Sequence, residues 1–142
     1  MNADGVARAP EPATSGLREH LGIRFIGMQD GAAVLALTIG PEHMNLASTL
    51  HGGAIATLVD IACALAARVP PGLPGAEPAA ARRGVATLSM TLNFTRPVSA
   101  GTVRAFGRRV GGGRSIVFAA CDVFDDQDRL VANGSGCYAF RS

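Results

Sequence analysis

Hydrophobic positions change from helical to alternating spacing near the middle of the chain. Between about Gly52 and Arg68, apolar residues recur three and four positions apart, and the remaining positions are nearly as apolar. This spacing predicts one long helix, and a helix that is apolar on all sides belongs in a protein interior. Pro70 and Pro71 end the pattern, because proline cannot continue a helix.

Alternation with a period of two predicts strands in the rest of the chain. From Ala86 to Thr95, apolar side chains alternate with threonine, serine and asparagine, as on a half-buried strand. Asp30-Gly31, between two apolar runs, indicates a hairpin. A short helical turn is expected over residues 17–21, and strands over 23–29, 32–39, 86–95, 102–110, 115–124 and 130–140.

The order of these elements predicts the fold class. Two strands, one long helix and four antiparallel strands form an α+β protein in which one curved sheet wraps around one helix. Such a sheet buries only one of its faces, so we expect the protein to dimerise. Residues 1–16 are expected to be a disordered leader, 17–142 a single domain, and the stretch from Gly72 to Arg83 a mobile loop.

Composition excludes several classes of function. The formal net charge of +2, with no Trp and one Tyr, gives no basic and aromatic surface for nucleic acid. We find no signal-peptide core and no membrane-spanning run, so a cytoplasmic protein without membrane contact is expected. Three cysteines, Cys63, Cys121 and Cys137, lack metal-ligand spacing and are expected to be buried free thiols.

One carboxylate stands out inside the predicted helix. Asp60 interrupts an otherwise apolar run, and a charge placed there is costly unless something compensates it. The helix also begins at His51-Gly52-Gly53, where free backbone N–H groups and the helix dipole favour a negatively polarised ligand atom. A glycine there lets a substrate carbonyl approach the backbone closely.

These residues together resemble a known family. The pattern of Asn45, His51-Gly52-Gly53 and Asp60, followed by the strand end 93–97 (Asn-Phe-Thr-Arg-Pro), is similar to the hotdog-fold acyl-CoA thioesterases. The greatest similarity is to their phenylacetate-pathway, PaaI-like branch, and it covers about residues 17–141. Ser48 stands where this family usually has glycine.

The resemblance implies a hotdog fold, a homodimer that often pairs into a homotetramer, and hydrolysis of an acyl-CoA without metal or separate cofactor. Asp60 would act as general base on water or as nucleophile. We expect the Gly52 amide to polarise the thioester carbonyl, with Asn45 assisting and His51 fixing the loop or the sulfur end of the thioester. Thr87 matches a water-orienting hydroxyl of the family.

Helix geometry requires two chains for this chemistry. Asp60 follows Gly52 by eight positions, which is about 12 Å along a helix axis. One reacting carbon cannot contact both residues. Two antiparallel helices related by a two-fold axis would instead bring the helix start of one chain to Asp60 of the other.

Purely structural roles remain open for each of these residues. Asp60 could be held by an arginine or by backbone donors, His51 could be a hydrogen-bonded loop histidine, and Asn45 could brace a turn. Thr87 could simply belong to the polar face of its strand. His20 and His43 have no partner that the sequence identifies.

Arginines beside the 111–113 glycine turn are candidates for binding the phosphates of coenzyme A. Arg108, Arg109 and Arg114 are the main ones, with Arg82-Arg83 beside the loop, and solvated strand ends are the alternative.

The leading function is hydrolysis of an aryl-acetyl or medium-chain acyl-CoA. A non-catalytic acyl-CoA-binding module is the alternative, and the motif of a hotdog dehydratase is not found.

Overall fold

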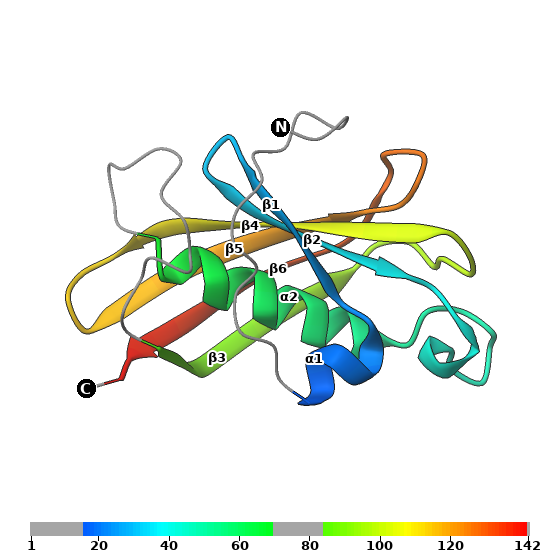
Figure 1. The fold of residues 1–142 in the computed structure, drawn as a ribbon, viewed down its shortest axis with the longest axis horizontal. Coiled ribbons are helices and arrows are strands. Elements are labelled where there is room, and N and C mark those ends of the chain that lie inside the picture. Colours follow the sequence, from blue (N-terminus) through cyan, green and yellow to red (C-terminus); the bar gives the residue numbers. More distant parts are fainter. Residues whose placement is uncertain (1–15, 70–83, 142) are drawn as a thin grey trace.

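The computed structural model describes residues 16–69 and 84–141. Six strands form one antiparallel sheet in the order β1-β2-β4-β5-β6-β3, and a long helix, α2, crosses it (Figure 1). The elements are α1 (Gly16–Leu21), β1 (Arg24–Gln29), β2 (Ala32–Thr38), the 3-10 turn η1 (Pro41–His43), α2 (Gly52–Ala67), β3 (Val85–Phe94), β4 (Thr102–Gly112), β5 (Ile116–Phe124) and β6 (Leu130–Phe140).

This architecture confirms the expected α+β hotdog arrangement. Each predicted strand is present with its ends shifted by at most two residues, and the long helix ends at Ala67. Asp30 and Gly31 have φ values of 50° and 79°, which are the left-handed conformations that a tight hairpin turn requires. The expected leader falls almost entirely outside the described residues, and the whole of the loop predicted between Gly72 and Arg83 lies outside them.

The core lies between α2 and the concave face of the sheet. Side chains from α2, including Leu58, Val59 and Ala62, are completely buried against inward-facing residues such as Leu35 and Val103. The closest approach is at Gly107 of β4, where an added Cβ would lie 2.3 Å from the Ala62 carbonyl oxygen. The helix backbone therefore rests on the strand with no side chain between them.

The two edges of the sheet differ in how they are protected. β1 has six residues, includes Arg24, and is bent by a bulge between Phe25 and Gly27. β3 has ten residues with no charged side chain, and Leu88 and Phe94 are both more than half exposed. Long, uncharged edge strands of this kind tend to pair with another strand.

None of the helices within residues 16–69 and 84–141 combines the length and apolarity that a bilayer crossing requires.

The close contact between α2 and β4 predicts that one methyl group added at Gly107 lowers the stability of the protein. Gly107→Ala should lower the free energy of unfolding by about 2–3 kcal/mol, because the helix backbone must move away from the sheet. Gly111→Ala, on the same strand with open space around its Cβ position, should change stability by less than about 0.5 kcal/mol. Urea unfolding of both variants tests this, and equal stabilities would contradict it.

Candidate active site

The start of α2 is organised by His51. Its backbone is extended, and its ring Nδ1 accepts a hydrogen bond of 2.8 Å from the Gly53 N–H. The His51 carbonyl accepts hydrogen bonds from the N–H groups of Ala54 and Ile55. His51 is thus the N-cap of the helix, and no acceptor among the described residues takes the N–H of Gly52.

The loop before α2 is held by Asn45. Its side-chain oxygen accepts hydrogen bonds from the N–H groups of Ala47 (2.9 Å) and Thr49 (3.1 Å), and its amide nitrogen donates to the Thr49 hydroxyl (2.9 Å). Asn45 therefore braces the turn, and one of its two amide hydrogens remains for another acceptor. Ser48 has a φ of 58°, so it keeps the left-handed backbone conformation that a glycine would adopt there.

His43 has partners that the sequence did not reveal. Its buried ring accepts a hydrogen bond from the Gly40 N–H at Nδ1 (2.9 Å) and donates from Nε2 to the Leu21 carbonyl (2.7 Å). Its own carbonyl accepts from the His51 N–H at 2.8 Å. This histidine connects the end of α1 to the residue that begins α2.

Asp60 lies farther along α2 and is half-buried. Its Oδ1 accepts hydrogen bonds from the Thr87 hydroxyl (2.7 Å) and from the Tyr138 hydroxyl (3.3 Å). Thr87, which the resemblance matched to a water-orienting hydroxyl, therefore contacts this carboxylate directly. The ion pairs found within residues 16–69 and 84–141 do not include Asp60, so hydroxyl groups and not an arginine hold it.

Tyr138 is the functional candidate that sequence reasoning missed. It lies on β6 directly opposite Thr87 of β3, and it is completely buried. Burial, together with the neighbouring Cys63 and Asp60 side chains, raises the pKa of its hydroxyl, so the hydroxyl stays protonated and acts as a donor. One feature of the sequence could have indicated it. The only tyrosine in the chain occupies an inward position in the alternating pattern of the strand expected over 130–140.

A cavity of about 310 Å³ opens at the other end of the helix. Gly52 lines it, and Phe94 lies near enough that its ring would contact a Cβ at position 52 at 3.4 Å. Arg96 also lines it, a cation that the sequence analysis did not select. The full lining is Asn45, Thr49, Leu50, Gly52, Ile55, Phe94, Thr95, Arg96, Pro97 and Val98.

Asp60 is absent from this cavity. It contacts Thr87 near the beginning of β3, whereas Gly52 contacts Phe94 at the end of that strand. The separation expected from helix geometry is therefore present, and one chain does not bring these two groups together.

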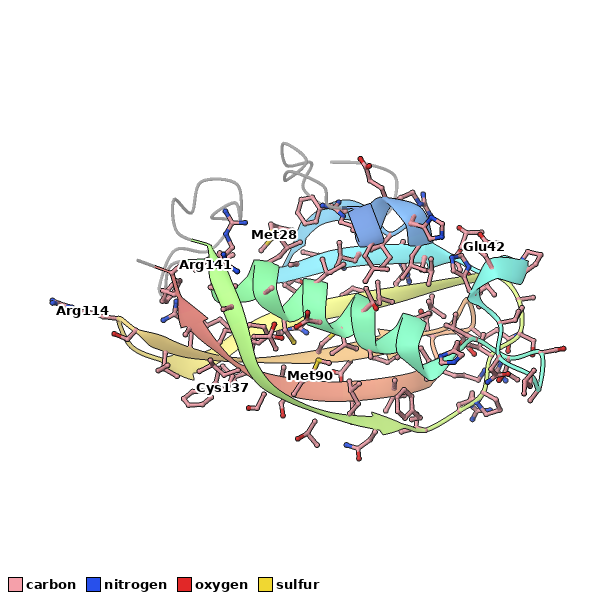
Figure 2. The ribbon with its side chains drawn as sticks, turned by 90° about the horizontal axis from the view of Figure 1, so that it is seen from below. Met28, Glu42, Met90, Arg114, Cys137 and Arg141 are labelled. Atoms are coloured by element: carbon pink, nitrogen blue, oxygen red, sulfur yellow. The ribbon has the colours of Figure 1, made fainter. Side chains whose placement is uncertain are left out.

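The three candidate arginines of the β4–β5 hairpin do not form one cluster. Arg109 donates to the carbonyl of Ala67 at the end of α2, whereas Arg108 lines a shallow cavity beside Phe106 and Phe124. Arg114 extends outward from the tip of the hairpin, away from α2 (Figure 2).

Cys63 and Cys121 are buried free thiols, as expected, and Cys137 is a half-buried free thiol. Within residues 16–69 and 84–141, no three His, Cys, Asp or Glu side chains come together as metal ligands.

Comparison with known proteins identifies the family. A family model described as the thioesterase superfamily matches residues 47–132. The chain belongs to this superfamily. A Halobacterium salinarum protein that carries the provisional name of esterase is 31% identical over 134 residues, covering 87% of this chain and 83% of that one.

Solved structures of other proteins share the fold. A conserved Pseudomonas aeruginosa protein has 28% identity and a TM-score of 0.79, covering 90% of this chain and 95% of that chain. A mutant of the phenylacetic acid degradation protein PaaI from Thermus thermophilus has 27% identity and a TM-score of 0.72, covering 90% and 100%. Matches to two other relatives span only part of their length, 32% of an Archaeoglobus fulgidus protein and 59% of a Caenorhabditis elegans protein.

Proposed function

We propose that this protein is a thioester hydrolase that converts an acyl-CoA to the free acid and coenzyme A. The observation that carries the proposal is a pair of complementary groups. Gly52, whose N–H has no acceptor among the described residues, lines a cavity at the start of α2, and Asp60, on the same helix, is held by two hydroxyls. An aryl-acetyl or medium-chain acyl group is proposed, and the PaaI relative favours the aryl-acetyl class.

The two groups would meet in a homodimer formed through β3. This strand is long, uncharged and unpaired on one side, and a second copy of it covers this edge in both chains at once. Antiparallel pairing about a two-fold axis perpendicular to the sheet places both α2 helices side by side and antiparallel on one face.

A bulge in β3 supports one register for this dimer. Pairing with β6 shifts between Thr87 and Ser89, so Leu88 is an extra residue. Because of it, Thr87 and Phe94 both face α2 although their numbers differ in parity. Directly opposite residues of antiparallel strands share a face. We pair Thr91 with Thr91 of the partner subunit. When the extra residue Leu88 is left out of the count, Thr87 then lies opposite the partner's Phe94.

In this register, Asp60 of one chain faces the Gly52 amide of the other. The thioester oxygen accepts a hydrogen bond from the Gly52 N–H. This hydrogen bond polarises the carbonyl and stabilises the negative charge that develops during attack. As general base, Asp60 takes a proton from water while the water oxygen bonds to the carbonyl carbon. As nucleophile, it forms a mixed anhydride that water hydrolyses. In both routes the carbon–sulfur bond breaks and the coenzyme A thiolate leaves and is protonated.

Coenzyme A contacts remain predictions at Arg108, Arg109 and Arg114. Arg109 is engaged with the α2 carboxyl end, so we add Arg96, which lines the Gly52 cavity. A homotetramer built from two such dimers also remains a prediction. The alternative function, a non-catalytic acyl-CoA-binding module, would bind the same ligand without releasing thiol.

Asp60 provides the first test. Asp60→Asn should lower kcat for phenylacetyl-CoA by roughly 100-fold or more, because it removes the general base or nucleophile, while the protein still dimerises. Thiol release measures the rate and sedimentation measures the dimer. Thr57→Val, on the same helix, should keep the rate. An Asp60→Asn variant as fast as the unmodified protein would contradict the proposal, and ligand binding without turnover in the unmodified protein would favour the binding module.

Mixed dimers test whether the site is shared. Asp60→Ala and Gly52→Val chains, coexpressed with different tags, should regain about one quarter of full activity, because half of random dimers are mixed and each has one intact site of two. Two differently tagged Asp60→Ala chains provide the control. Purified mixed dimers without activity would contradict a shared site.

Cysteine cross-linking tests the register. Thr91→Cys should give a covalent dimer on mild oxidation, because residues at the two-fold axis have Cβ atoms about 5 Å apart. Asn93→Cys, two positions along the strand, should not cross-link to itself. Efficient cross-linking of the second variant and not the first would contradict this pairing.

A further inference from the structure

Tyr138 and Thr87 approach the same oxygen of Asp60. Both hydroxyls donate to Oδ1, at 3.3 Å and 2.7 Å. Within the part of the chain that the structure describes, no hydrogen bond reaches Oδ2. Oδ1 of the carboxylate is therefore restrained by two hydrogen bonds, whereas Oδ2 is available.

The fold contains a specific arrangement that brings the Tyr138 hydroxyl to this position. Tyr138 and Thr87 are directly paired across β6 and β3, so their side chains emerge on the same face beneath α2. The Tyr138 ring lies over Gly136, where an added Cβ would come within 2.7 Å of the hydroxyl oxygen. A side chain at position 136 would displace the ring, so glycine there leaves space for the phenol.

We infer that Tyr138 is a positioning residue for the reaction proposed above. By restraining Oδ1 together with Thr87, it fixes the plane of the Asp60 carboxylate and directs Oδ2 toward the water or thioester carbon supplied at the partner's helix start. A donor that is rigid and completely buried costs no reorganisation at the moment of reaction. The inference concerns turnover and not substrate binding, because Tyr138 does not line the Gly52 cavity.

Kinetics of Tyr138→Phe test this role. The variant keeps the ring over Gly136 and removes only the hydroxyl, so kcat should fall roughly 10-fold, as expected for loss of a hydrogen bond to a charged group, with KM within about twofold. Cys137→Ser, whose side chain lies on the opposite face of β6, should keep both constants. A residue with only a structural role would change the melting temperature and leave kcat of the folded protein unchanged.

A spectroscopic signal tests the contact independently of activity. Because the chain has one tyrosine, labelling with [13Cζ]tyrosine gives a single NMR resonance that reports on the Tyr138 hydroxyl. Asp60→Asn should move this resonance upfield, since donation to a charged carboxylate shifts it toward the phenolate position. Thr57→Val, which leaves Asp60 intact, should leave it in place.

The two measurements separate this inference from the proposed function. An unchanged kcat in Tyr138→Phe, or a resonance that ignores Asp60→Asn, would overturn the positioning role even if Asp60 is essential for hydrolysis. If the resonance responds to Asp60→Asn but hydrolysis does not need Asp60, the contact between Tyr138 and Asp60 exists. That result would overturn both the role of Tyr138 in turnover and the proposed function. A slow Tyr138→Phe variant with an Asp60-dependent resonance supports both.

Discussion

Direct contact between the backbone of α2 and the backbone of β4 governs the geometry of this protein. At Gly107 the helix rests on the sheet with no intervening side chain, and this sets the height of the helix above the strands. At that height Asp60 reaches the hydroxyls of Thr87 and Tyr138, and Gly52 lies against Phe94. A helix held farther from the sheet would leave the carboxylate without its hydrogen bonds.

The choice of partners for Asp60 has a chemical consequence. A half-buried carboxylate needs compensation, and an arginine would supply it by neutralising the charge. Hydroxyl donors instead satisfy one oxygen and leave the net charge in place. A carboxylate held in this way keeps one oxygen open, as the proposed hydrolysis requires.

Most of the fold, but only part of the site, could be predicted from the sequence. Periodicity located the helix and the strands, and the composition of the Asp30-Gly31 turn identified its hairpin. The motif selected Gly52, His51, Asn45 and Asp60 as candidates, and the resemblance added Thr87 without its contact with Asp60. Tyr138 was missed because its contact with Asp60 joins positions 78 residues apart, and no local pattern encodes such a pairing. Arg108 and Arg109 are neighbours in sequence, but alternation along a strand sends their side chains to opposite faces.

Leu88 has a role that does not depend on its side chain. An extra residue in a strand shifts the alternation by one position. If odd-numbered residues face inward before it, even-numbered residues face inward after it. Upstream of Leu88 the odd-numbered Thr87 faces the helix, and downstream the even-numbered Met90 and Leu92 pack into the core. The strand can therefore present the Thr87 hydroxyl and a row of apolar side chains to the same side, whereas a strand of the same length in which Leu88 paired regularly with β6 would turn this hydroxyl to solvent without breaking the sheet.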